Sequence, residues 1–321
     1  MFRRRNQGRK TLLVIGVPRS GTSATTEMLS HLGLNLPVTD DLMAPEPWNE
    51  RGYFESSSLS TFDEALLQAL GGSVTDPPAL VPGWEHLAPL ADWRVRARIL
   101  FAQAFPDCGT SVWKDPRQSI LLPFWREVLS DHTLAAVFVW RHPIESARSL
   151  CKMLAGMTEM YHADGEPSGP LSRSLRAHGS APSLAHGLAL WELYTRESLT
   201  AMAGLPVFVS PYSDLLARTG PWQEAVARWL HRLQFVDRRR GLPGPPTVTE
   251  ALRHEHLGDG ETAALLSRSQ QALWQSLQRL ETTHSRFAPP ALAPIDETTT
   301  ELLRRVHLME VLQEPGRGLS P

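Results

Sequence analysis

An apolar strand that runs directly into a glycine-containing loop and then a helix constrains the fold of this chain more than any other feature. Residues 11–17 read Thr-Leu-Leu-Val-Ile-Gly-Val, an aliphatic and β-branched run without polar alternation. Such a run is typical of a strand covered on both faces, as in parallel sheets. The loop at 16–23 follows, and residues 24–32 carry their apolar side chains at helical spacing. This succession predicts a phosphate site at the helix N-terminus.

Further apolar runs alternate with helical patterns along the chain, which is typical of an α/β fold with a doubly wound, mostly parallel sheet. Ligands of such folds bind at the carboxyl ends of the strands. We expect a basic flexible tail at 1–10 and a single α/β domain at 11–321, of which 241–321 form a helical C-terminal part. Strands are predicted at 110–113, 134–140 and 205–210, and helices at 93–105, 144–154, 184–202, 261–280 and 298–312.

Composition excludes several classes of protein. The formal net charge is −2, so nothing in the overall balance indicates nucleic acid or an anionic membrane as a partner. The chain has two cysteines, Cys108 and Cys151, and neither has the spacing of a zinc ligand or of a disulfide framework. The apolar run after the basic start is too short for a signal peptide or a membrane span. We therefore expect a cytoplasmic protein, with a long loop or lid at 158–183.

The loop at 16–23 departs from the usual phosphate-binding loop in a way that matters chemically. It reads Gly16-x-x-x-x-Gly21-Thr22-Ser23, which is the Walker A spacing with Thr22 in place of the lysine. In nucleoside triphosphatases that lysine reaches the β- and γ-phosphates. Here the cation is Arg19, and the amides from Ser20 onward can still cradle an anion. Such a site suits a phosphosulfate leaving group, which needs no metal.

A second group of residues follows the strand predicted at 134–140. Arg141 stands at the strand end, Pro143 is placed to open a helix, and Ser149 comes eight residues after the arginine. Ser149 would then lie about two helical turns in, so that both polar side chains could converge on one phosphate. The alternative for Arg141 is a surface arginine or one that makes an ion pair.

These motifs resemble the PAPS-dependent sulfotransferases, and the likeness is greatest to a bacterial branch with a Trp-Lys-Asp-Pro-Arg element. The resemblance covers about residues 11–216. It implies that PAPS is the sulfuryl donor, that Arg141 and Ser149 bind its 3′-phosphate, and that the first loop binds its 5′-phosphosulfate. The loop residues concerned are Pro18, Arg19, Ser20, Gly21, Thr22 and Ser23.

Two further elements fit this resemblance. Trp113-Lys114-Asp115-Pro116-Arg117 ends a predicted strand beside the first loop, so that Lys114 or Arg117 either adds charge to the phosphosulfate site or pairs with Asp115. Tyr212 and Asp214, in a Tyr-Ser-Asp-Leu sequence after a later strand, are interpreted as structural. Trp191, Trp222 and Trp229 are expected in the core.

Sulfuryl transfer also needs a base for the acceptor proton. No histidine occurs between His31 and His86, so a carboxylate is the better hypothesis. Glu55, in a Gly-Tyr-Phe-Glu element, and Glu50 are both candidates, with Glu46 a third. We favour Glu55, although all three glutamates could equally be solvated loop acids.

The sequence thus predicts an enzyme that moves a sulfuryl group from PAPS to a hydroxyl or amine of a small-molecule, carbohydrate or lipid acceptor. The candidate catalytic residues are Arg19, Glu55, Glu50 and Lys114. No metal is expected, because His254-Glu255-His256 lacks a third ligand at standard spacing. Two alternatives remain: a variant P-loop kinase or other nucleoside triphosphatase, and a non-catalytic nucleotide-binding protein. The acceptor, the oligomeric state and the pathway are not predicted.

Overall fold

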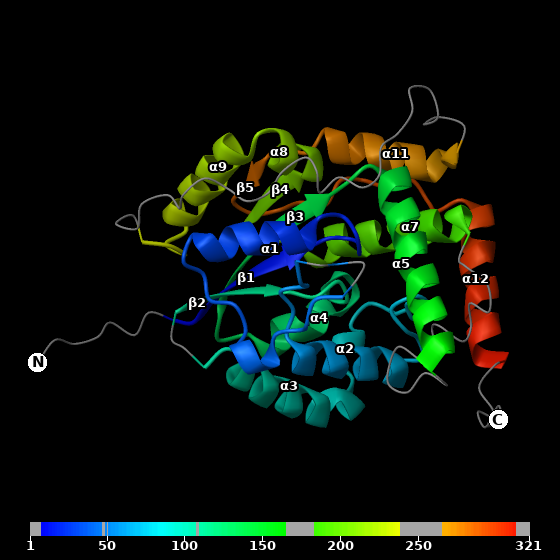
Figure 1. Cartoon of the computed structure of the whole chain (residues 1–321), viewed down its shortest axis with the longest axis horizontal. Coiled ribbons are helices and arrows are strands. Elements are labelled where there is room, and N and C mark those ends of the chain that lie inside the picture. Colours follow the sequence, from blue (N-terminus) through cyan, green and yellow to red (C-terminus); the bar gives the residue numbers. More distant parts are fainter. Residues whose placement is uncertain are drawn as a thin grey trace, which may run out of the picture.

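A mostly parallel five-stranded sheet forms the centre of the computed structural model (Figure 1). Its strand order is β2-β1-β3-β4-β5, in which only the pair β4–β5 is antiparallel. The strands are β1 (Lys10–Ile15), β2 (Thr110–Lys114), β3 (Thr133–Trp140), β4 (Val207–Pro211) and β5 (Thr283–His284). The structure describes residues 8–46, 49, 51–106, 109–164, 183–237 and 265–312.

Helices cover both faces of the sheet (Figure 1). The α-helices are α1 (Thr22–His31), α2 (Ser57–Ala69), α3 (Ala91–Ala104), α4 (Gln118–Val128), α5 (Pro143–Asp164), α7 (Leu184–Ala201), α8 (Tyr212–Ala217), α9 (Thr219–Arg232), α11 (Arg268–Gln278) and α12 (Glu297–Leu312). Short 3₁₀ turns lie at Thr39–Asp41, Trp84–His86 and Ala88–Leu90. No α-helix in the described part of the chain has the length and apolar character that a membrane span needs.

Strand β1 shows why the sheet is buried on both sides. Leu13 and Ile15 belong to the core beneath α2, α3, α4 and α7, whereas Leu12 and Val14 belong to the core shared with α1, α8 and α9. Successive side chains of a strand point to opposite faces, so an unbroken aliphatic run supplies both cores at once. The predicted doubly wound α/β fold is therefore confirmed.

The order of the strands fixes where a ligand can bind. The chain passes from β1 through α1 to β2 on one side, and β3 lies on the other side of β1. The crevice at such a switch point, beyond the carboxyl ends of the strands, is where doubly wound sheets bind ligands. The loop after β1 and the residues after β3 both face this crevice.

Several boundaries differ from the prediction. Helix α5 begins at Pro143 as expected but continues to Asp164, through the first part of the loop predicted at 158–183. The rest of that segment lies outside the described residues, as do residues 238–264 with His254-Glu255-His256. Strand β1 begins at Lys10, one residue inside the expected tail. The helix predicted at 261–280 is described as α11 at Arg268–Gln278.

Candidate active site

The loop between β1 and α1 has an unusual backbone. Arg19 lies in the left-handed region with φ 71°, and Gly21, which precedes the helix, has φ 98°. A non-glycine residue with positive φ costs about 1–2 kcal/mol, which the surrounding structure must offset. The turn is closed by the amide of Ser20, which donates to the carbonyl of Val17 at 3.1 Å. The Ser20 amide is thus used inside the loop, contrary to its predicted part in an anion cradle.

The amides of the first turn of α1 remain suited to an anion. No side chain caps the helix at Gly21, and Thr22 and Ser23 open the first turn. The N–H groups at a helix start have no partner within the helix and carry the positive end of its dipole. The Oγ of Ser20 is buried and has no hydrogen-bond partner among the described residues. Both observations fit a loop built to receive the oxygens of a bound anion.

Close packing explains why both loop glycines are needed. A Cβ at Gly16 would overlap the carbonyl of Val139 in β3, and a Cβ at Gly21 would overlap the ring of Tyr212. Tyr212 directly follows β4, beside Arg141 at the end of β3, because the two strands pair Trp140 with Pro211. The ring of Tyr212 therefore lies against the loop.

The residues predicted after β3 meet the loop after β1. Arg19 Nε donates to Ser149 Oγ at 3.2 Å, across 130 residues of sequence. Burial lowers the pKa of Arg19, and the nearby charge of Arg141 lowers it further. The Arg141 guanidinium lies 5.4 Å from the centre of the Tyr212 ring. The structure thus brings two arginines of like charge together at the carboxyl ends of β1 and β3.

One carboxylate holds Arg141 in place. Arg141 Nε donates to Glu145 Oε2 at 2.8 Å, one turn into α5, and both side chains are buried. Glu145 was not among the predicted site residues, although its (i, i+4) spacing from Arg141 is typical of an ion pair on a helix. The ion-pair alternative for Arg141 is therefore present in the structure, as a buried pair, and the phosphate contact stays a prediction.

The candidate base and the candidate lysine form a second group beside the loop. Lys114 is the last residue of β2, where it pairs with Val14 of β1. Its Nζ donates to Glu55 Oε1, and both side chains are buried. Burial raises the pKa of Glu55, and the charge of Lys114 opposes that rise. Two residues 59 positions apart are thus brought into one ion pair.

Glu55 is positioned by the start of α2. Its carbonyl accepts from the amide of Met43 at 2.9 Å, and the next residue, Ser56, caps the helix by accepting from the amide of Leu59 at 3.1 Å. A capping serine with extended backbone fixes the direction in which the chain enters a helix. The backbone of Glu55 is therefore fixed by the hydrogen bond to its carbonyl and by the helix cap at the next residue.

The structure describes only one of the other two candidate bases. Glu46 accepts a hydrogen bond from the hydroxyl of Tyr53, and Glu50 lies outside the described residues. The ring of Tyr53 lies 5.8 Å from Lys114 Nζ, and Tyr53 also acts to raise the pKa of Arg19. Tyr53, which the sequence analysis did not select, therefore stands between the loop after β1 and the Glu55–Lys114 pair.

Of the two alternatives for Arg117, the structure has the ion pair. Arg117 Nη1 lies 3.1 Å from Asp115 Oδ1, and its Nε lies 2.8 Å from Glu64 Oε2. It is thus committed to carboxylates rather than directed at the loop. Burial alone would lower the pKa of Arg117, but Asp115 and Glu64 outweigh it and hold that pKa well above its usual range.

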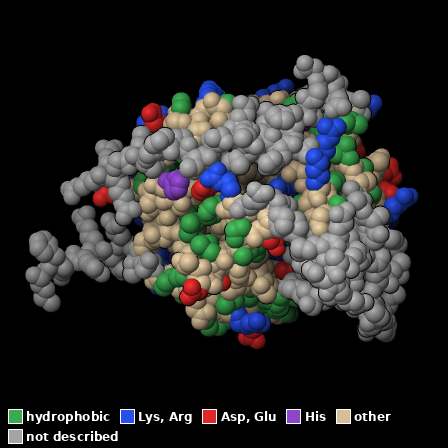
Figure 2. Space-filling model, viewed as in Figure 1, with side chains coloured by type: hydrophobic (Ala, Val, Ile, Leu, Met, Phe, Trp, Pro, Cys, Tyr) green, Lys and Arg blue, Asp and Glu red, His purple; other side chains and the backbone are tan. Residues whose placement is uncertain are grey.

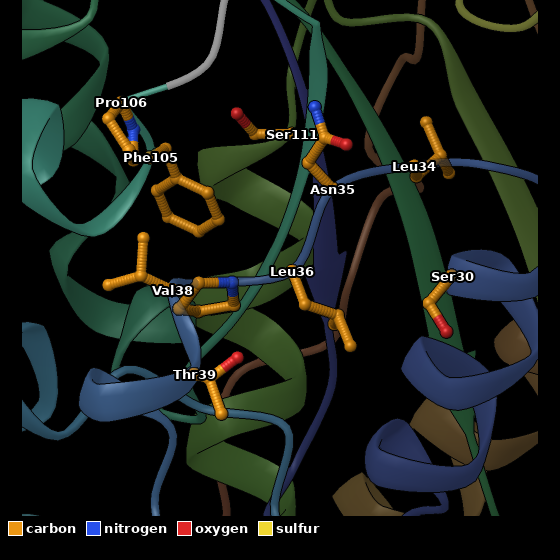
Figure 3. Close-up of a pocket in the computed structure, with 10 residues that line it drawn as sticks. Ser30, Leu34, Asn35, Leu36, Val38, Thr39, Phe105, Pro106 and Ser111 are labelled. Atoms are coloured by element: carbon orange, nitrogen blue, oxygen red, sulfur yellow. The ribbon is translucent and has the colours of Figure 1, made fainter.

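A cavity of about 370 Å³ lies at the other end of the sheet (Figure 3). Its walls come from the segment after α1, from the end of α3 and from Ser111 near the start of β2. Asn35 of this segment forms a β-bridge with Ser111, whereas the loop at 16–23 follows the opposite end of β1. This cavity is separate from the site described above.

Comparisons with known proteins give a likeness of fold. No protein-family profile matches the chain, and no curated protein sequence matches it. Among solved structures, the chain is similar to the sulfotransferase domain from the Synechococcus PCC 7002 olefin synthase, with 15% identity and a TM-score of 0.38. That match covers 98% of this chain and 99% of that one.

A second match is the sulfotransferase domain from the curacin biosynthetic pathway, with 12% identity, a TM-score of 0.38, and coverage of 93% and 97%.

Proposed function

We propose that the chain is a PAPS-dependent sulfotransferase. In this proposal the first turn of α1 and Arg19 hold the 5′-phosphosulfate, and Arg141 with Ser149 holds the 3′-phosphate. Glu55 takes the proton of the acceptor hydroxyl or amine. Lys114 stabilises the charge that develops on the oxygen bridging sulfur and phosphorus.

The observation that carries the proposal is the contact between Arg19 and Ser149, at 3.2 Å. It joins the loop after β1 to the motif after β3, with Arg141 close enough to lower the pKa of Arg19. Two guanidinium groups in a partly dry site repel each other, and a bound anion would relieve this repulsion further than the Glu145 carboxylate beside Arg141 does. A nucleotide with phosphates at both the 3′ and 5′ positions supplies such anions.

The transfer step follows from the same residues. The acceptor oxygen or nitrogen attacks sulfur, the bond from sulfur to the bridging oxygen breaks, and that oxygen leaves on the 5′-phosphate of adenosine 3′,5′-bisphosphate. Glu55 accepts the acceptor proton as the new bond forms. Once Glu55 is neutral, the charge of Lys114 is no longer balanced by its partner and can stabilise the departing phosphate.

Nucleotide binding tests the donor side. Titration with adenosine 3′,5′-bisphosphate should raise the melting temperature without Mg²⁺, because a ligand bound only to the folded state stabilises it. Stabilisation by Mg·ATP alone would support the kinase alternative and contradict our proposal. Transfer of labelled sulfuryl from PAPS to a panel of acceptors then separates an enzyme from a protein that only binds the nucleotide.

Arg141→Ala tests the assigned 3′-phosphate contact. Hydrogen bonds to charged groups contribute about 1.5–3 kcal/mol, so the variant should bind the bisphosphate roughly 10- to 150-fold more weakly. Its affinity for adenosine 5′-monophosphate should change much less. Arg218→Ala is the control, because Arg218 is exposed and pairs only with Asp214 one turn away in the contacts described. An equal loss for both nucleotides would remove Arg141 from this role.

A further inference from the structure

A buried cluster of charged side chains surrounds the end of β2, away from the arginines of the donor site. It joins the loop before α2, the first two turns of α2 and the turn from β2 into α4. Its carboxylates outnumber its cations, four to two. The members are Glu55, Asp63, Glu64, Lys114, Asp115 and Arg117, all of them buried.

Arg117 is the centre of this cluster. Its backbone amide donates to Asp115 Oδ1 at 2.8 Å and its Nη1 donates to the same oxygen at 3.1 Å. Its Nε donates to Glu64 Oε2 at 2.8 Å and its Nη1 to Ser60 Oγ at 3.0 Å. The planar fork of arginine suits such multiple contacts. Arg117 therefore fixes Asp115 in the turn that directly follows Lys114.

The surplus of acid is only partly relieved by protonation. Asp63 Oδ1 accepts from Trp125 Nε1 at 2.8 Å, and its Oδ2 has no partner among the described residues. Burial, with the charge of Asp115 added, raises the pKa of Asp63 well above its usual range, which favours the neutral form of this carboxyl. Glu55, Glu64 and Asp115 then share Lys114 and Arg117, which leaves one carboxylate too many.

We propose that Asp115, fixed by Arg117, is a positioning residue that opposes the ionisation of Glu55 and so keeps Glu55 able to accept a proton. The charge of Lys114 favours the ionised form of Glu55 and so weakens it as a base. A second buried carboxylate in the adjoining turn restores its affinity for a proton. The link to catalysis rests on the proposed function, in which Glu55 is the base.

The directions of the electrostatic effects support this geometry. After burial, which raises the pKa of Glu55 most, Lys114 lowers that pKa and Asp115 raises it, while Arg117 lowers it by less. The groups that act on Glu55 are Lys114 at the end of β2 and Asp115 and Arg117 in the turn after it. Tyr53 lies near Lys114, and Asp63 and Glu64 of α2 belong to the same cluster through Asp115 and Arg117. Asp115 is the carboxylate among them that raises the pKa of Glu55.

The test is a direct titration of Glu55 in the full chain. Carbon-13 at the glutamate side-chain carboxyl gives one NMR signal per residue, and the signal lost in Glu55→Gln identifies Glu55. We expect Asp115→Asn to move the titration of this signal to lower pH, because the asparagine keeps the acceptor for Arg117 but removes the charge. Asp214→Asn, at an exposed ion pair with Arg218, is the matched control and should leave the curve in place.

A second variant keeps the proposal testable if Asp115→Asn does not fold. Asp115→Ser also removes the charge, and its hydroxyl can still accept from Arg117, so Glu64 keeps its arginine partner. This variant should likewise titrate at lower pH than the wild type, because the carboxylate that raises the pKa of Glu55 is gone. An unchanged curve, or a shift to higher pH in either variant, would overturn the proposal.

The titration needs neither donor nor acceptor, so it is independent of the proposed function. Once transfer is measured, the acid limb of kcat/KM should move to lower pH in Asp115→Asn, since that limb reports the base of the free enzyme. A moved titration with an unmoved acid limb would leave the role of Asp115 intact and exclude Glu55 as the base. A structural role of Asp115 alone would change the height of the profile and not its position.

Discussion

The donor end and the cluster around Glu55 sit at the carboxyl ends of neighbouring strands, yet their charges are arranged in opposite ways. At the end proposed to bind the donor, Arg19, Arg51 and Arg141 lie around Tyr212, and the ion pairs described there join Arg51 to Glu27 and Arg141 to Glu145. Around Glu55, four carboxylates face two cations. The first group is therefore rich in arginine, whereas the second is rich in carboxylates.

This difference separates the two tasks of a group-transfer site. Arginines gathered in one site favour a bound anion, which fits the nucleotide end of our proposal. A buried site with surplus carboxylates has to hold a proton on one of them, which fits the acceptor end. Tyr53 lies between the two, with its ring near Lys114. On the face seen in Figure 2, basic and acidic side chains are interspersed.

Removal of Lys114 should have the largest effect, because it breaks the pairing on which the acidic cluster depends. Lys114→Met leaves Glu55 buried without its partner, and breaking a buried ion pair costs about 3–5 kcal/mol. The pKa of Glu55 is already raised by burial, and loss of the lysine raises it further. The loss of stability should therefore be greatest at high pH and shrink as the pH falls and Glu55 takes up a proton.

Urea unfolding at pH 8 and pH 5 measures this loss. The double variant Lys114→Met with Glu55→Gln is the control, because it leaves no unpaired charge and should recover much of the stability. If Lys114→Met lost the same stability at both pH values, the ionisation of Glu55 would not be the cause.

Gly21→Ala should have the next largest effect, and it acts on the donor end. Alanine at φ 98° is strained, and its Cβ would overlap the ring of Tyr212. The strain alone costs about 1–2 kcal/mol, and displacement of the ring adds to it. The bisphosphate should bind more weakly as well, since the loop has to move. Gly220→Ala in α9 is the control, because a Cβ there meets nothing within 4 Å.

Two measurements on Gly21→Ala separate the two ends of the site. Unfolding by urea gives the stability of Gly21→Ala, and the Glu55 signal gives the state of the acidic cluster in the same protein. We expect the titration of Glu55 to stay unchanged in this variant. A shift in that titration would show that the two ends do not behave independently.

The fold could be read from the sequence where burial leaves a clear pattern. The four parallel strands were predicted within one or two residues at most ends, because strands covered on both faces are continuous apolar runs. Helices α2 and α4 were not predicted. Both have apolar residues at helical spacing, but α2 opens with serines and α4 contains Pro123, residues that disfavour a helix interior. Strand β5 has two residues, too few for any pattern.

The site was predictable in part, for a physical reason. The donor residues follow strand ends, and the carboxyl ends of parallel strands meet at one edge, so Arg19 and Ser149 could be expected close together. The partner of Lys114 could not be foreseen, because Glu55 lies on a loop whose path depends on the packing of α2. Asp63 and Glu64 gave no signal for the same reason, since their burial follows from a helix that the sequence did not predict.

The smallest effect is expected from Asp63→Asn, which removes a carboxyl whose ionisation is unfavourable inside the acidic cluster. The pKa of Asp63 is raised in the folded state, so its contribution to stability is complete below its pKa in the unfolded chain and is lost as pH rises through the folded value. Asparagine keeps the acceptor for Trp125 and does not titrate. Its amide lacks a partner at the Oδ2 position, which offsets part of the gain.

We expect a net gain in the free energy of unfolding of about 1 kcal/mol at pH 8 and none at pH 4. Urea unfolding at both pH values measures it, with Asp214→Asn as the exposed control; a gain that did not grow with pH would show that Asp63 is ionised in the folded protein and that the cluster holds one more negative charge than we infer.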